Sequence, residues 1–309
     1  MSTMQAISVH TYGNANQLHL EQIAQPEPQE GDVLVRVHAA GVNALDWKIR
    51  SGAMKSVMPS TFPYVPGIEL AGVVERVGPG VTTFRPGQEV FGQSTGGAYA
   101  QYCLVSAQTL ALKPTSLSFD EAAAVPIGAI TAWQGLFDHG HLQAGQRVLI
   151  LGGSGGVGTF AVQFARRKGA QVITTTSTSN RDFVRSLGAE TVIDYTQKRV
   201  EDEVHNVDLV FDTVGGEATG SALATLKRGG RLITTAGQPD EGLAQALGVS
   251  AEFLFMQPST DLLERFAHLI DTGELRTSLS TIFPLSDADK AHELSQSGHG
   301  RGRIILHVA

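Results

Sequence analysis

The chain has 309 residues, 42% of them hydrophobic and 17% charged, so its length suits two domains rather than one. Its formal net charge is -7 and it has no run of Lys and Arg, which argues against nucleic acid or an anionic membrane surface as a partner. No apolar stretch approaches the roughly 20 residues of a membrane span, and the N-terminus lacks the features of a signal peptide, so we expect a cytoplasmic protein.

The chain contains a single cysteine, Cys103. One cysteine excludes an intramolecular disulfide and every zinc site that is built on several thiolates. Because Cys103 lies in a strand pattern, we expect a small, buried and unreactive core residue.

The first part of the chain, residues 4 to about 113, is predicted to be mainly β. Short runs rich in Val, Leu and Ala, such as residues 33–41 and 69–78, alternate with clusters of Gly and Pro that favour tight turns.

A short helix is predicted over residues 44–52, with Gly52 placed to end it. Asp46 and Arg50 are spaced four residues apart, so the two side chains can meet on one face of this helix. We interpret them as an ion pair that supports the loop at Asn43, in preference to a purely catalytic pair.

After about Asp120 short apolar runs alternate with helical stretches, which is typical of a parallel, doubly wound sheet with helices on both faces. The predicted strands are residues 147–153, 171–176, 190–194, 208–212, 230–237 and 251–255.

The end of the chain is expected to return to the first part. We predict a helix over residues 261–271, capped by Thr260 and ended at Gly273. A second helix is predicted over residues 286–297, and a last strand over residues 303–308.

The strongest local motif is GGSGGVG at residues 152–158, which follows a buried strand and opens an amphipathic helix closed by Gly169. Gly153, Gly155 and Gly158 have the G-x-G-x-x-G spacing of a dinucleotide-binding turn. The backbone N–H groups and the dipole at the start of such a helix attract phosphate. We therefore expect a dinucleotide here, with contacts from the turn residues Gly153, Ser154, Gly155, Gly156 and Val157.

The residues at the end of the next strand distinguish enzymes that bind NAD from those that bind NADP. NAD enzymes place a carboxylate after it, whereas this strand ends in three threonines that include Thr175. Ser177, Asn180 and Arg181 follow as hydrogen-bond donors and a fixed positive charge, which favours NADPH. The alternative is that residues 177–181 form a solvated turn that caps the next helix. The two interpretations are compatible.

The chain resembles the medium-chain dehydrogenase/reductase superfamily over nearly its whole length. The similarity lies in the order and spacing of AAGVNALDWKIRSG, VPGIELAGVVERVGPGVTTFRPGQEVFG, GGAYAQY, AAAVPIGAITAW, GGSGGVG, VFDTVGG and GHGRGRIILHV. This resemblance implies an α/β fold: a Rossmann-type doubly wound parallel sheet that binds NADPH over residues 121–258, and a GroES-like, mainly β catalytic domain over residues 1–120 that residues 259–309 complete.

Zinc-dependent alcohol dehydrogenases of this superfamily carry cysteine, histidine and cysteine where this chain has Asn43, Ile68 and Ile127. The lobe with four cysteines is also missing. The chain is accordingly similar to the zinc-free quinone oxidoreductases and NADPH-dependent alkenal/one reductases, which share Asn43 and Asp46, and we expect no metal.

The resemblance also implies further site residues. Asn43 is expected near the nicotinamide and the substrate, and Asn43, Asp46 and Tyr64 are the candidate catalytic residues. Cofactor contacts are expected from Thr131, from Tyr195 near the 2′-phosphate, from the loops after later strands, and, for the phosphates, from arginines near the C-terminus. These last residues are Val214, Thr235, Ala236, Gly237, Phe255, Met256, Arg301 and Arg303.

We expect NADPH to reduce a small electrophile, a quinone or an enal/enone, in a cleft between the domains of a homodimer. The alternatives are an enoyl-thioester reductase and a non-catalytic NADPH-binding sensor or structural protein. Tyr64 and Tyr99 are candidate pocket residues, although half-buried packing is the commoner role of a tyrosine. His139 and His141 form H-x-H in a polar loop without a nearby third ligand, which does not indicate a metal.

Overall fold

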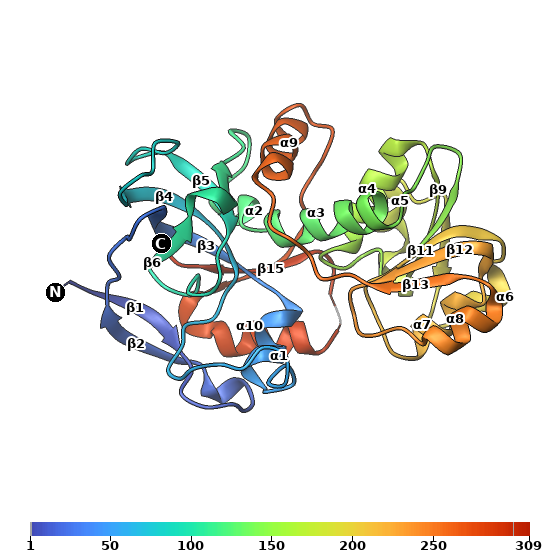
Figure 1. The fold of residues 1–309 in the computed structure, drawn as a ribbon, viewed down its shortest axis with the longest axis horizontal. Coiled ribbons are helices and arrows are strands. Elements are labelled where there is room, and N and C mark those ends of the chain that lie inside the picture. The colour runs from blue at the N-terminus through green and yellow to red at the C-terminus, as the bar shows by residue number, and fades with distance from the viewer. Residues whose placement is uncertain (1, 299) are drawn as a thin grey trace. The chain divides into compact units, whose positions relative to one another are not determined.

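The structure is a computed structural model that describes residues 2–298 and 300–309. The chain folds into two compact units, and Figure 1 colours the chain from blue at the N-terminus to red at the C-terminus, so the first unit contains both ends of the colour scale. The first unit holds the residues up to Ile127 together with Pro258–Ala309, and the second unit holds Gly128–Gln257. The C-terminal segment therefore folds with the N-terminal part of the chain.

The first unit is built on a seven-stranded sheet of order β14-β15-β3-β4-β5-β7, with β6 paired to β3. Its pairs are antiparallel except β14 with β15. The strands are β3 (Asp32–Val42), β4 (Glu69–Val77), β5 (Glu89–Gln93), β6 (Tyr102–Ser106), β7 (Leu110–Leu112), β14 (Leu279–Pro284) and β15 (Arg303–His307). A separate antiparallel pair is formed by β1 (Thr3–Ser8) and β2 (His19–Ala24).

Helices pack on the sheet of the first unit, and α1 contacts α10. They are α1 (Ala44–Arg50), α2 (Phe119–Ala122), α9 (Thr260–Asp271) and α10 (Ala288–Gln296), with 3-10 turns at Ala15–Gln17, Ala107–Thr109 and Leu285–Asp287. The core beneath them contains alternate residues of β3, Val33, Val35 and Val37, because one face of the strand is turned inward. Cys103 is buried in this core, as expected.

The second unit confirms the predicted doubly wound fold. Its six strands are all parallel and follow the order β10-β9-β8-β11-β12-β13, which reverses direction between β8 and β11. The strands are β8 (Arg147–Leu151), β9 (Gln171–Thr176), β10 (Thr191–Asp194), β11 (Val207–Asp212), β12 (Leu226–Thr234) and β13 (Ser250–Phe253). In such sheets ligands bind beyond the carboxyl ends of the strands at the point of reversal.

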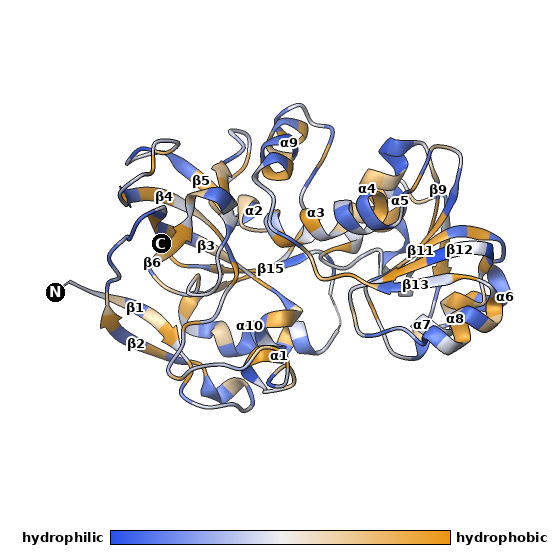
Figure 2. Cartoon of the chain, in the orientation of Figure 1, coloured by the Kyte–Doolittle hydropathy of each residue, from blue (hydrophilic) through white to orange (hydrophobic). Residues whose placement is uncertain are grey.

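Helices connect these strands, and Figure 2 shows polar and apolar residues mixed along the helices. They are α3 (Pro126–Trp133), which begins before the second unit and continues as a π-helix (Gln134–His139), α4 (Gly158–Lys168), the 3-10 turn Thr178–Asn180, α5 (Arg181–Leu187), α6 (Val200–Glu203), α7 (Glu217–Leu223) and α8 (Glu241–Leu247). Within the described ranges no helix combines the length and the apolar character needed to cross a membrane.

Two local predictions were wrong. Asp46 and Arg50 do not pair: Asp46 accepts from the backbone N–H of Asn43, while Arg50 donates to the carbonyl of Gly13 and to the side chain of Gln296. Contacts with residues outside the helix thus replace the predicted ion pair between Asp46 and Arg50.

The cap of α9 is Ser259 and not Thr260. Ser259 has an extended backbone, and its hydroxyl accepts from the N–H of Leu262. Thr260 is already the first helical residue and donates its hydroxyl to the carbonyl of Gln108 at 2.5 Å.

Candidate functional site

The glycine-rich turn joins β8 to α4 in the second unit, and its glycines are required by contact distances. A Cβ atom on Gly153 would lie 2.0 Å from Oγ1 of Thr174, and one on Gly158 would lie 2.1 Å from the carbonyl oxygen of Gly152. A side chain at Gly153 would collide with the side chain of Thr174, and one at Gly158 would collide with the backbone. The turn is therefore folded tightly against its neighbours, and its N–H groups lie at the start of α4, where a phosphate binds favourably.

The threonines at the end of β9 hold this turn in place. Thr175 accepts from the N–H of Gly152 through its hydroxyl and from the N–H of Gly153 through its carbonyl, both at 3.1 Å. Thr176 donates its hydroxyl to Oγ of Ser154 at 2.9 Å. The threonines of β9 are buried. An apolar residue could fill the same space, but it could not make the hydrogen bonds that hold the turn.

A cluster of donors stands where β9 ends. The amide of Asn180 lies 3.5 Å from Oγ of Ser154 and 3.3 Å from Oγ of Ser177. The Nε atom of Arg181 is buried and, among the described residues, has no hydrogen-bond partner. Tyr195, just after β10, is about half exposed and donates its N–H to the carbonyl of Thr176. This donor cluster (Ser154, Ser177, Asn180 and Arg181) has the composition of an anion site.

Sequence reasoning missed a carboxylate near this cluster, Asp194 at the end of β10. Asp194 accepts from the hydroxyls of Thr178 at 2.5 Å and Thr196 at 2.6 Å, and from the N–H of Thr196. The bond from Thr178 is the largest cause that lowers the pKa of Asp194. The carboxylate braces the turn that carries the donor cluster, and strand order, not sequence spacing, brings it there.

The loops after β11 and β12 are held by Asp212, another residue that the sequence analysis did not single out. Its buried carboxylate accepts from the N–H groups of Val214 and Gly215 at 2.8 and 3.0 Å. It also accepts from the hydroxyls of Thr219 and Thr234 at 2.6 and 3.0 Å. Four donors therefore fix the loop backbones.

The remaining predicted cofactor residues of the second unit lie at or near the carboxyl ends of the parallel strands or on α3. Thr235, Ala236 and Gly237 follow β12, the exposed Phe255 and the partly buried Met256 follow β13, and Thr131 is buried on α3. Gln134 was missed: its amide bonds both the N–H and the carbonyl of Gln257 at 2.9 Å, which fixes the segment after β13.

In the first unit a buried ionic network surrounds Asn43. Its Nδ2 donates to Oε1 of Glu69 at 2.8 Å, and its Oδ1 accepts from Nη2 of Arg303 at 3.0 Å. Arg303 pairs with Glu69, whose second oxygen accepts from the N–H of Ile127 at 2.8 Å. Burial lowers the pKa of Arg303 to about 10, so the guanidinium stays charged at neutral pH. The amide of Asn43 is thereby fixed and keeps one N–H uncommitted.

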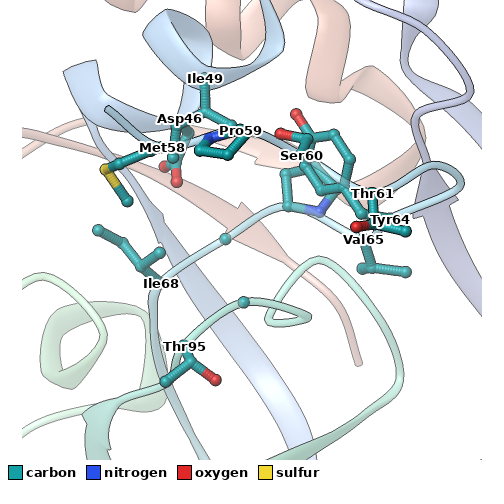
Figure 3. A pocket seen from close by; sticks show the side chains of 13 residues that line it. Asp46, Ile49, Met58, Pro59, Ser60, Thr61, Tyr64, Val65, Ile68 and Thr95 are labelled. Carbon is teal, nitrogen blue, oxygen red and sulfur yellow. The ribbon is translucent and has the colours of Figure 1, made fainter. Parts of the chain in front are cut away.

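A cavity of about 210 Å³ opens beside this network in the first unit. Figure 3 shows the labelled side chains around it, with Asp46 and Ile49 coming from α1 and Thr95 from the loop after β5. The lining residues are Asp46, Ile49, Met58, Pro59, Ser60, Thr61, Tyr64, Val65, Pro66, Gly67, Ile68, Thr95 and Gly96.

Two ionisable groups of the cavity wall are shifted by burial. Burial raises the pKa of Asp46 to about 6, against the opposing bonds from Asn43 and Tyr99. It also raises the pKa of Tyr64 to about 12, so the phenol stays protonated. The hydroxyl of Tyr64 is buried and has no hydrogen-bond partner among the described residues.

The structure thus brings Asn43, Asp46, Tyr64 and Arg303 into one unit. Arg301 lies exposed in the loop before β15. His139 lies against Glu252 at 2.7 Å and His141 against the carbonyl of Phe137 at 3.2 Å. In the part of the chain that the structure describes, no three His, Cys, Asp or Glu residues are grouped closely enough to hold a metal.

Family models match three segments of the chain. The alcohol dehydrogenase GroES-like domain matches residues 29–115, the zinc-binding dehydrogenase model residues 187–306, and the C-terminal domain of alanine dehydrogenase/PNT residues 137–226. A 2-methylene-furan-3-one reductase of Solanum lycopersicum is 34% identical, with 99% of this chain and 79% of that protein covered. The chain belongs to the medium-chain dehydrogenase/reductase superfamily, in its quinone oxidoreductase branch.

Two further relatives agree with this assignment. An NADPH-dependent alkenal/one oxidoreductase of Arabidopsis thaliana, named as chloroplastic, is 33% identical, with 98% of this chain and 79% of that protein covered. The structure of the quinone oxidoreductase from Coxiella burnetii superposes with a TM-score of 0.93 at 32% identity, covering 100% of both chains. The chain is therefore an oxidoreductase of this superfamily with a nicotinamide cofactor.

The residues of this chain do not fit the zinc that the name of one matching family model implies. Asn43, Ile68 and Ile127 offer neither thiolate nor imidazole, which are the ligands that catalytic zinc prefers. The nearby carboxylate of Glu69 is already paired with the charged guanidinium of Arg303. We derive no step through a metal.

Removing the guanidinium should leave the buried charge of Glu69 uncompensated. We expect Arg303→Met to lower the free energy of unfolding by about 3–5 kcal/mol, measured by urea denaturation. Arg85→Met, at an exposed arginine of the same unit, is the control and should change it by less than about 0.5 kcal/mol. Adding Glu69→Gln to Arg303→Met should recover part of the loss, and additive effects of the two substitutions would contradict the network.

Proposed function

We propose that this oxidoreductase uses NADPH, without zinc, to reduce a small quinone or α,β-unsaturated carbonyl. The observation that carries the proposal is the donor cluster at the end of β9, in which Arg181 has a buried Nε without a partner. A 2′-phosphate would accept hydrogen bonds from the hydroxyls, the amide and the charged guanidinium of this cluster. Asp194, the nearby carboxylate, is already engaged by Thr178 and Thr196, so it does not replace the ribose-binding acid of NAD enzymes.

The residues of the second unit fit such a cofactor. Gly153, Ser154, Gly155, Gly156 and Val157 would hold the diphosphate at the start of α4, where a side chain on Gly153 has no room. Ser177, Arg181 and Tyr195 would hold the 2′-phosphate. When bound, the cofactor supplies the hydride, so the chain needs no covalent nucleophile.

The chain's own part in the chemistry is to orient the acceptor and to meet the charge that reduction creates. Reduction of an enone at its β-carbon places negative charge on the carbonyl oxygen, which requires a hydrogen-bond donor. The free hydroxyl of Tyr64 and the uncommitted N–H of Asn43 are the donors of the first unit that fit this need. The cavity of about 210 Å³, lined largely by apolar side chains, suits a small acceptor.

Arg181 should decide between the two nicotinamide cofactors. We expect Arg181→Ala to weaken NADPH binding about 10-fold and to change NADH binding less than about twofold, because only NADPH carries the group that the guanidinium meets. Calorimetry measures both. Arg185→Ala, on the same helix and paired with Asp182, is the matched control and should leave both affinities unchanged. Tighter binding of NADH than of NADPH by the unaltered protein would contradict the cofactor proposal.

The reaction is tested by NADPH oxidation with a panel of quinones, enals and enones. We expect turnover of at least one class, and Tyr64→Phe should lower kcat about 10-fold or more with enones because the charged oxygen loses its donor. Tyr102→Phe, on strand β6 and outside the cavity lining, is the control. Inactivity across the panel would contradict the proposal, and turnover of crotonyl thioester alone would assign an enoyl-thioester reductase instead.

We further propose a homodimer that forms by pairing the edges of the parallel sheets. The edge strand β13 supports this, because its residues alternate between exposed and partly buried and its outer backbone groups have no neighbouring strand in the described chain. Sedimentation should give about twice the chain mass of 32.7 kDa. A single species at the mass of one chain would contradict it.

A further inference from the structure

A buried chain of hydrogen bonds leads from the C-terminal segment to the cavity wall. His292 on α10 has Nε2 3.2 Å from the hydroxyl of Tyr99, and this hydroxyl lies 3.0 Å from Oδ2 of Asp46 on α1. The same carboxylate oxygen accepts from the N–H of Asn43 at 2.8 Å. Figure 1 shows α1 and α10 side by side, and the two helices contact each other. Three segments far apart in sequence thus meet at one carboxylate.

The number of available protons decides which group donates and which accepts in each of these hydrogen bonds. An ionised carboxylate only accepts, so the single proton of Tyr99 is donated to Asp46. The oxygen of Tyr99 must then accept from His292, which places the ring proton of His292 on Nε2. The other nitrogen, Nδ1, is then an unprotonated acceptor, and it is buried without a partner in the described part of the chain.

The charge state of His292 agrees with this direction. Burial lowers the pKa of His292 to about 3, and the nearby charge of Arg50 acts in the same sense. The ring is therefore neutral at any pH at which the protein would work, so it acts as a fixed donor and not as a titrating base. Both His292 and Tyr99 are fully buried and neither lines the cavity, whereas Asp46 does.

We propose that Tyr99 and His292 are positioning residues that hold the Asp46 carboxylate as an oriented acceptor, and through it hold the Asn43 turn beside the cavity. The inference rests on the proposed function, in which Asn43 faces the reacting molecules. Simple packing does not account for the chain, because phenylalanine and leucine would fill the same volume without burying two polar side chains. The C-terminal helix α10 thereby acts on the site without touching a ligand.

The groups that face Asp46 determine what a loss of this chain should do. The bonds from Asn43, Tyr99 and Gly67 and the charge of Arg303 favour its ionised form, whereas burial opposes it. Tyr64 also lies close enough to interact with its charge. Removing the bond from Tyr99 withdraws stabilisation from the ionised form only, so the pKa of Asp46 should rise.

The test is a carboxyl titration of Asp46 by ¹³C NMR, with Asp46→Asn to assign the signal. We expect Tyr99→Phe to raise the titration midpoint by about one pH unit. His292→Leu should raise it by less, because His292 acts through Tyr99. His292→Gln can return a donor at the Nε2 position and should restore the original midpoint. Phe91→Leu, a buried change elsewhere in the first unit, is the matched control for destabilisation alone and should leave the midpoint unchanged.

The same variants are assayed for NADPH oxidation. We expect the pH at which kcat is half-maximal to move with the titration midpoint, and KM for NADPH to change less than about twofold. If Tyr99→Phe does not fold, the comparison of His292→Gln with His292→Leu decides. An unmoved midpoint in Tyr99→Phe, or a glutamine variant no different from the leucine variant, overturns the inference. If the unaltered protein reduces no acceptor, the proposed function fails, but the NMR titration still tests whether Tyr99 and His292 act on Asp46.

Discussion

The buried ion pair of Glu69 and Arg303 is the interaction on which the first unit's site depends. Burying both charges is costly unless each finds partners. Here Asn43 bonds both side chains and the N–H of Ile127 donates to Glu69, whereas Nε of Arg303 has no partner among the described residues. The result is a rigid polar centre around Asn43, one of the three positions compared above with zinc ligands. A fixed positive charge and an oriented amide occupy that place, which suits a site whose task is to position reactants.

The second unit achieves the same rigidity by a different physical means. Its glycine turn is shaped by steric exclusion, since neighbouring atoms leave no room for a Cβ at Gly153 or Gly158. Hydroxyls of β9 and the carboxylates of Asp194 and Asp212 then fix the surrounding loops by accepting or donating bonds. A site that is rigid before its ligand arrives loses less conformational entropy on binding.

Much of the fold could be predicted because its signals are local. The strands of the parallel sheet and the turn before α4 were found from apolar runs and glycine spacing, and the burial of Cys103 from its strand pattern. The errors concern contacts that compete with a local pattern. Arg50 bonds Gly13 and Gln296, which lie far away in sequence, and does not pair with Asp46. Ser259, and not Thr260, caps α9, because the helix begins one residue earlier than predicted.

The sequence by itself determined the superfamily, the dinucleotide turn and the absence of thiolates at the zinc positions, because each is a property of residue identity at short spacing. Only the tertiary structure showed that Glu69, Arg303 and Asn43 form one network, and that His292 reaches Asp46 through Tyr99. These partners lie up to 260 residues apart. No spacing rule joins them, because sheet order and helix packing decide which distant side chains share a buried volume.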